Sequence, residues 1–224
     1  MKNKVCSVAF LVVAMLSSIK TQAQYIQDII GRPFSVKAYA DVIGSPFLYD
    51  GWQTGIVKLQ NGDTFKDIPL LYNAIDNELY FKSKKGDTLS FVDPVSEFQI
   101  STDSKENAAK VTFRRGYKGV KNYTADTFFE VLSDGTVQFL KKTAKYVQST
   151  KDVGSATVNK TVRQDVNYYL VNADKIVSVK KDRKSILFNL PGSEQKLQSY
   201  LAANKVNFKD DADLIKLVNQ YNSL

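Results

Sequence analysis

The stretch Ile56-Val57-Lys58-Leu59-Gln60-Asn61-Gly62-Asp63-Thr64-Phe65 decides the fold class, because it places two short β-prone runs on either side of an Asn-Gly turn. Asn-Gly accepts the positive φ angles that a two-residue hairpin turn requires. The stretch therefore predicts a β-hairpin over residues 56–65.

Three further hairpins of the same design follow along the chain, each made of two apolar runs around a turn that contains Gly, Asn or Asp. The predicted strand pairs are 79–81 with 89–91, 128–132 with 137–140, and 168–171 with 176–179. Residues 98–100 and 111–113 supply two more candidate strands. A sheet of about ten strands has to curl, close or split into two layers. We therefore predict a mainly β (α+β) fold, built as a curved antiparallel meander or incomplete barrel.

One apolar run, Ile68-Pro69-Leu70-Leu71, contains a proline. Proline cannot donate a ladder hydrogen bond, so it belongs on an edge strand, at a strand start or at a bulge. We expect the sheet to bend there.

Near the C-terminus the apolar spacing becomes helical. Pro191-Gly192-Ser193 is expected to end the last strand, with Ser193 capping a first helix. Asp210 is expected to cap a second helix, with Asp213 three residues on as in a capping box. The apolar faces consist of Leu197, Tyr200 and Leu201 in the first helix and of Leu214, Leu217, Val218 and Tyr221 in the second. We predict an antiparallel β domain over residues 24–190 and a C-terminal helix pair over 191–224 that packs on the sheet.

The first 23 residues have the pattern of an export signal. Lys2 and Lys4 precede an apolar run over residues 5–16, and Thr21-Gln22-Ala23 offers small residues at a cleavage site. A membrane-spanning helix needs about 20 apolar residues, more than this run contains. We expect a signal peptide over 1–23 and an exported product, periplasmic or secreted and not transmembrane; an uncleaved anchor is the alternative.

The composition excludes several kinds of site. The chain has no histidine, and Cys6 is its only cysteine, inside the predicted signal. Ser-His-Asp triads, cysteine nucleophiles, disulfides and His/Cys zinc sites are therefore excluded from the mature chain. We expect no catalytic residues, no metal and no cofactor.

Positive charge gathers in residues 141–196, which carry 12 basic and 5 acidic side chains. Lys180, Lys181, Arg183 and Lys184 form its densest cluster, in an expected turn. Such charges keep strand edges from pairing with other chains, and they also attract anionic lipid, phosphorylated glycan or nucleic acid. Nucleic acid is not an expected partner of an exported protein.

Aromatic side chains gather around Trp52, the single tryptophan, which follows Pro46, Phe47 and Tyr49. Tyr49 and Trp52 are candidates for stacking on sugar rings or seating a partner. The alternative is that this cluster fills the open end of the curved sheet.

A polar segment, residues 148–165, has few large apolar side chains. Loops of this length are uncommon unless they are functional or disordered. We expect a long loop that is either a partner-binding element or disordered.

Candidate catalytic groups are few. Paired carboxylates for glycan hydrolysis could come from Asp63, Asp67, Asp76, Glu78, Asp93 or Glu97, although turn aspartates also bond their own backbone. Ser193-Glu194-Gln195-Lys196 has the serine-lysine spacing of penicillin-recognising enzymes but lacks their partner motifs, which favours a helix start. Asp210, Asp211 and Asp213 lack the glycine and glutamate of a calcium loop and are interpreted as a helix start.

The chain resembles exported β-rich proteins of Bacteroidota-type bacteria that have no assigned function. The resemblance rests on residues 55–62, 68–73, 78–80, 179–190 and 214–222, which are turns and core positions. It implies an exported β-rich fold and brings no catalytic residues.

These observations predict a non-enzymatic envelope protein that binds a ligand or takes part in assembly. The expected partners are an envelope protein, a glycan or an anionic surface, and a sheet edge is one possible contact. A carboxylate-dependent glycan hydrolase is the alternative from another functional class.

Overall fold

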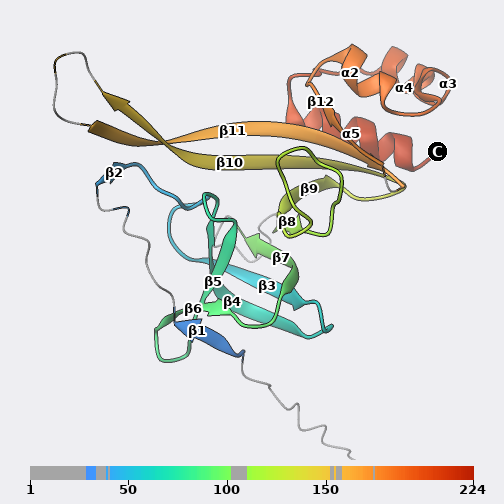
Figure 1. Cartoon of the computed structure of the whole chain (residues 1–224). Helices are drawn as coiled ribbons and strands as arrows, with labels where there is room; N and C mark the ends of the chain where they lie inside the picture. Colours follow the sequence, from blue (N-terminus) through green and yellow to red (C-terminus); the bar gives the residue numbers. More distant parts are fainter. Residues whose placement is uncertain are drawn as a thin grey trace, which may run out of the picture.

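The structure is a computed structural model that describes residues 29–33, 39, 41–101, 110–151, 154, 158–173 and 175–224. The predicted signal, residues 1–23, lies outside these residues. In the described part of the chain the fold is mainly β: a 12-stranded sheet that does not close, with helices at the C-terminal end (Figure 1). This confirms the predicted fold class.

The sheet consists of two meanders, β3–β6 and β7–β12, which join where β7 pairs with β3. The pairs are antiparallel except that β2 runs parallel to β11. The strands are β1 (Gly31–Pro33), β2 (Val42–Ile43), β3 (Gln53–Leu59), β4 (Thr64–Asn73), β5 (Glu78–Lys82), β6 (Thr88–Phe91), β7 (Val95–Ser101), β8 (Lys110–Arg114), β9 (Phe129–Ser133), β10 (Val137–Lys151), β11 (Val158–Asn172) and β12 (Lys175–Val179). The helices are α2 (Arg183–Phe188), α3 (Ser193–Lys196), α4 (Gln198–Ala203) and α5 (Asp211–Asn222).

The four predicted hairpins are all present, as β3–β4, β5–β6, β9–β10 and β11–β12. In the first, Gly62 has a φ of 97°, and the Asn61 side chain accepts a hydrogen bond of 2.9 Å from the Asp63 amide. Local turn chemistry therefore sets these strand pairs.

The β3–β4 pairing is irregular close to Pro69, the residue at which a bend of the sheet is expected. Pro69 pairs with Thr54 of β3, while β5 pairs with β4 only from Leu70 onward, so Pro69 has a partner strand on one side only. The β3–β4 register shifts beside Gly55, and a Cβ at that glycine would lie 2.2 Å from the Gln99 carbonyl oxygen. Only glycine fits this close approach of two strands.

Three apolar clusters fill the structure. The first consists mainly of side chains from strands β3 to β8, and in it the rings of Phe98 and Phe113 stack at a centroid distance of 4.7 Å. The other two lie on opposite faces of β9–β12 because side chains alternate along each strand. Phe139 and Leu170 face the helices in the second cluster, whereas Leu140 and Tyr169 face the other side in the third.

The prediction of a long loop over residues 148–165 was wrong. Its described residues belong to a ribbon in which β10 and β11 pair from Val137↔Asn172 to Lys151↔Val158 (Figure 1). The outer part of this ribbon projects from the body, so Tyr146, Val158 and Val166 are all exposed. Both faces contact water there, and the apolar alternation that marks a half-buried strand is absent.

The helical boundaries also differ from the prediction. The last strand ends at Val179, not at Pro191, and α2 adds a helical segment before the expected pair. Ser193 is not an N-cap: Gly192 holds that position, and the Ser193 hydroxyl donates to the Leu187 carbonyl oxygen at 2.8 Å. Asp210 does cap α5, accepting from the Asp213 amide at 3.0 Å.

Lys142 connects the two halves of the fold from within. Its side chain is buried, and its Nζ donates to the Tyr72 hydroxyl and the Phe128 carbonyl, each at 3.1 Å, and to Asn77 Oδ1 at 3.3 Å. Tyr72 belongs to β4, Asn77 follows β4 in the turn, and Phe128 directly precedes β9. Burial lowers the pKa of Lys142 to about 8.

The lowered pKa of Lys142 predicts a pH-dependent stability. Between pH 8 and 10.5 the unfolded chain binds a proton that the folded chain has released, so the free energy of unfolding rises with pH. Across this pH window, we expect the free energy of unfolding of the wild type to rise by about 3 kcal/mol relative to that of Lys142→Met. Urea unfolding at a series of pH values measures this difference. The exposed Lys66→Met is the control, and a difference between wild type and Lys142→Met that stays constant with pH would contradict the prediction.

Candidate binding groove in the helical layer

The helices form a layer on one face of β10–β12 (Figure 1). The layer is attached by fully buried side chains, because Ile186, Leu197, Leu214 and Leu217 are each 0% exposed. The predicted stripe of α5 and the predicted face around Leu197 are therefore confirmed. Short helices are unstable alone, so this packing holds them in place.

Helix α2 begins where the local sequence provides a cap. The Asp182 carboxylate accepts from the Ser185 amide at 2.7 Å, and the Ser185 hydroxyl accepts from the Lys180 amide at 2.9 Å. Ile186 then enters the core, while Phe188 is 86% exposed.

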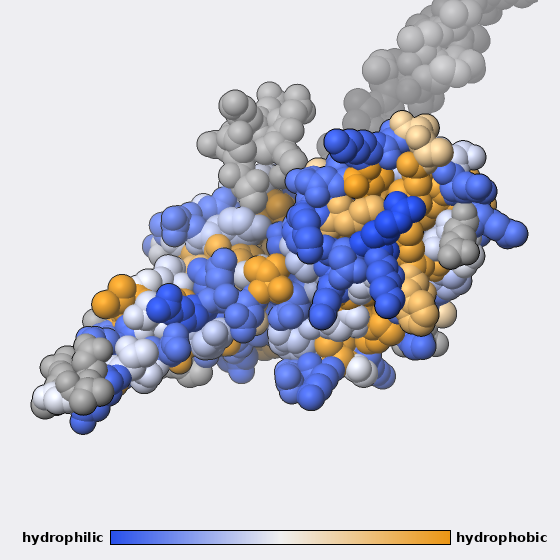
Figure 2. Space-filling view, turned by 90° about the horizontal axis from the view of Figure 1, so that it is seen from above, coloured by the Kyte–Doolittle hydropathy of each residue, from blue (hydrophilic) through white to orange (hydrophobic). Residues whose placement is uncertain are grey.

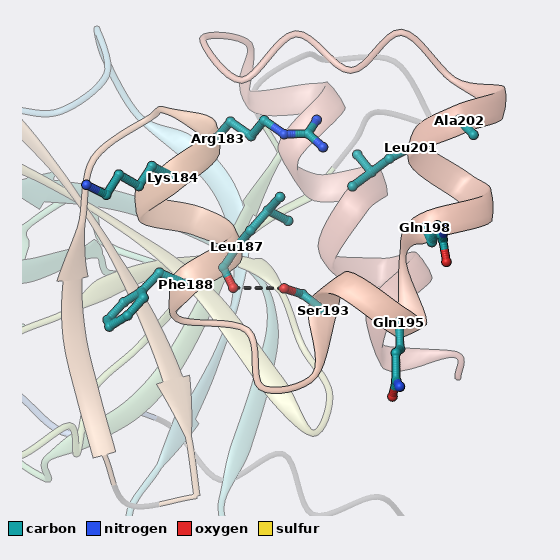
Figure 3. A pocket seen from close by; sticks show the side chains of 9 residues that line it. All are labelled: Arg183, Lys184, Leu187, Phe188, Ser193, Gln195, Gln198, Leu201 and Ala202. Carbon is teal, nitrogen blue, oxygen red and sulfur yellow. Dashed lines mark hydrogen bonds between the residues drawn. The ribbon is translucent and has the colours of Figure 1, made fainter.

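A hollow of about 1020 Å³ lies between α2 and α4, next to the point where Ser193 of α3 bonds Leu187 of α2. Arg183 and Leu187 of α2 and Leu201 of α4 point toward it from opposite sides (Figure 3). We call this hollow the α2–α4 groove. The residues that line it are Arg183, Lys184, Leu187, Phe188, Ser193, Gln195, Gln198, Leu201 and Ala202.

The α2–α4 groove combines apolar surface with positive charge. Lys184 and Phe188 lie on its outer rim, on the side of α2 that faces away from α4 (Figure 3). The Arg183 guanidinium lies 5.8 Å from the Phe208 ring centroid, a cation–π distance. Figure 2 shows hydrophobic residues gathered over the helical layer with long hydrophilic side chains beside them. Buried apolar contact and attraction of negative charge are therefore both available here.

An ion cluster anchors the helical layer to the sheet beside this groove. Asp211 accepts from Lys181 at 2.8 Å and from the Tyr168 hydroxyl at 2.9 Å, and Lys141 Nζ lies 3.4 Å from its other carboxylate oxygen. Although burial acts to raise it, the pKa of Asp211 is lowered by the hydrogen bonds from Lys181 and Tyr168. The cluster thus holds the start of α5 on β10 and β11.

Glu130 belongs to the same cluster and has the opposite shift. Burial raises the pKa of Glu130, and the charge of Asp211 adds to this effect. The ammonium group of Lys141 lies 3.6 Å from Glu130 and also contacts Asp211. Two carboxyl groups with displaced pKa values therefore share a lysine, which fits a structural ion pair network.

The predicted basic cluster is divided by the structure. Arg183 and Lys184 line the α2–α4 groove. Lys181 instead donates to Asp211 and to the Lys209 carbonyl oxygen, and its Nζ lies 5.0 Å from the Tyr168 ring centroid. Lys180 is exposed in the turn before α2. Two of the four predicted residues thus come together in one site.

Tyr49 and Trp52 lie in the other half of the protein. Tyr49 is half-buried against the first apolar cluster, and burial raises its pKa to about 12. Trp52 is half-buried, with Lys82 Nζ 6.0 Å from its ring centroid. These aromatic residues belong to a different surface from the α2–α4 groove.

Half of the candidate carboxylates meet in one place. Asp76, Glu78 and Asp93 line a cavity of about 440 Å³ together with Arg32 and Arg115. The others lie elsewhere: Asp63 bonds Asn61 in its turn, Asp67 has a φ of 56°, and Glu97 pairs with Arg114 at 2.6 Å. Among the described residues, no group of three acidic side chains is placed to hold a metal ion.

Sequence reasoning missed the groove because α2 was not predicted. The available signal was Asp182, a residue type that favours the N-cap position, shortly before the apolar pair Ile186 and Leu187. It also missed the inward-directed lysines of β10, since Lys142 donates to the Tyr72 hydroxyl and Lys145 donates to the Ser45 and Phe47 carbonyl oxygens. Part of the basic segment is thus used inside the fold.

Comparison with protein-family models, with curated proteins and with solved structures finds no match for this chain. In the described ranges, no helix has both the length and the apolar character that crossing a membrane requires.

The contacts of Ser193 and Lys196 predict that these two residues do not form a catalytic serine-lysine pair. Its hydroxyl donates to Leu187, whereas Lys196 Nζ lies 4.7 Å from the Tyr221 ring centroid. We expect Ser193→Ala to lower the free energy of unfolding by about 1 kcal/mol, because the Leu187 carbonyl loses a donor. We also expect no labelling of the wild type by a fluorescent penicillin; covalent labelling that Ser193→Ala abolishes would contradict this.

Proposed function

We propose that this chain is a non-enzymatic exported protein that binds an apolar, acidic segment of an envelope protein in the α2–α4 groove. The observation that carries the proposal is a hollow with aliphatic walls whose lining extends over α2 to Lys184 and to Phe188, which is 86% exposed on the outer rim. A single exposed apolar side chain is common, but its continuity with an aliphatic hollow and with cationic side chains supports an interaction site.

The chemistry of the groove favours a protein segment over the other expected partners. Glycan recognition uses flat aromatic platforms, whereas Leu187, Leu201 and Ala202 present aliphatic groups. An anionic surface attracts clusters of free cations, but Lys181 is engaged by Asp211. An apolar centre with arginine and amide groups at the rim is typical of protein interfaces.

An acidic amphipathic peptide with Leu and Phe anchors between Glu residues tests the proposal. We expect saturable binding by calorimetry, and about thirtyfold weaker binding to Phe188→Ser, since burying a phenylalanine contributes about 2 kcal/mol. The double variant Arg183→Gln with Lys184→Gln, with Phe188 intact, should also bind the peptide more weakly than the wild type does. Its affinity should no longer depend on salt concentration.

Two controls accompany this experiment. Ile43→Ser changes another exposed apolar side chain, far along the sheet on β2, and should bind the peptide as the wild type does. A peptide with Lys in place of Glu should not bind. Equal affinity for both peptides, or undiminished affinity of Phe188→Ser, would contradict the proposal.

A second candidate function is hydrolysis of a glycan by paired carboxylates, which the shared cavity of Asp76, Glu78 and Asp93 favours. Our proposal predicts no turnover of envelope glycans by the wild type. Turnover that falls at least about a hundredfold in both Glu78→Gln and Asp93→Asn, with unchanged thermal unfolding, would establish the hydrolase instead.

A further inference from the structure

Another cavity, distinct from the α2–α4 groove and from the carboxylate cavity, lies at the β5–β6 turn in the other half of the protein. Its volume is about 480 Å³, within the range of small-molecule sites. Its walls are formed by side chains of the first apolar cluster and its edge: Ile29, Phe65, Ile68, Phe81 and Leu89. We call it the β5–β6 cavity.

The apolar walls of the β5–β6 cavity belong to fixed elements. Phe81 of β5 is 3% exposed and contacts Phe91 at a centroid distance of 4.7 Å. Phe65 and Ile68 come from β4 and are only half-buried. Apolar surface therefore remains available to a ligand without rearrangement of the core.

The rim of this cavity is basic. Lys82, Lys84 and Lys85 line it together with one acidic residue, Asp87. The Ser83 hydroxyl accepts a hydrogen bond from the Asp87 amide and donates one to the Asp87 carboxylate. These two hydrogen bonds order the turn that carries the lysines. Even without Lys84, the two ammonium groups of Lys82 and Lys85 outnumber the one carboxylate of Asp87, which leaves an excess of positive charge at the mouth of an apolar cavity.

We propose that the β5–β6 cavity binds a single-chain fatty acid anion, with the alkyl chain against Phe65, Ile68 and Leu89 and the carboxylate at the lysine rim. The apolar walls match the alkyl chain, and the charge of the rim matches the carboxylate. Lys82 also lies 6.0 Å from the ring of Trp52, the single tryptophan of the chain. Trp52 fluorescence therefore reports on this rim.

Titration of the full-length protein with decanoate below its micellar concentration tests this inference. We expect a saturable change in Trp52 emission and saturable binding by calorimetry. Decyltrimethylammonium has a comparable chain with the opposite charge, and acetate has the head group without the chain; neither should bind. Binding of the cation as strong as that of decanoate, or no saturable binding of decanoate, would overturn the inference.

Variants locate the site. Lys82→Gln with Lys85→Gln should weaken decanoate binding roughly five- to tenfold by calorimetry, the loss expected for two exposed charge contacts. Ile68→Gln should weaken it through the apolar wall, whereas Lys118→Gln, an exposed lysine outside the cavity, should have no effect. Unchanged binding in both cavity variants would overturn the inference.

Phe188→Ser separates this inference from the proposed function. It should bind decanoate as the wild type does, because Phe188 lines the α2–α4 groove and not this cavity. Loss of decanoate binding in this variant would show that decanoate binds in the α2–α4 groove, and it would overturn the inference that the β5–β6 cavity is its site. Failure of peptide binding with intact decanoate binding would leave the cavity supported and the proposed function refuted.

Discussion

Packing of the helical layer onto β10–β12 is the constraint on which the proposed binding site depends. Helices as short as α2 do not persist alone, so Ile186, Leu197 and Leu217 hold their segments by complete burial. Ile186, Leu197 and the half-buried Tyr200 pack against the same apolar cluster, and the surfaces that α2 and α4 leave uncovered border the groove. The Asp211 cluster fixes the start of α5, and the two hydrogen bonds exchanged between the Asn222 side chain and the Val137 backbone fix its end.

Positive charge in this protein serves two purposes. Lys142 and Lys145 of β10 donate to groups in the first half of the fold, and Lys181 holds the start of α5. These lysines stabilise contacts between segments that are distant in sequence. Arg183 and Lys184 remain exposed at the groove. A high basic count therefore overstates the charge available to a partner, and only the three-dimensional arrangement separates the two sets.

Local chemistry explains what the sequence could predict. The hairpin at Asn61-Gly62 and the cap at Asp210 depend on neighbouring residues, and both are present, although only Gly62 and not Asn61 takes the expected positive φ. The outer part of the β10–β11 ribbon was not predictable, because with water on both faces its strands lack apolar alternation. The groove escaped prediction for another reason: Leu187 and Leu201 face each other only after separate helices dock on the sheet.

The central claim is that the α2–α4 groove is the surface through which this protein acts. Amide chemical shifts of the isotope-labelled protein, followed by NMR during titration with the acidic amphipathic peptide, test it most directly. The account predicts shifts concentrated in residues 183–188 and 193–203, with the outer β10–β11 ribbon unaffected. Shifts concentrated on that ribbon or around the carboxylate cavity, or none at saturating peptide, would contradict it.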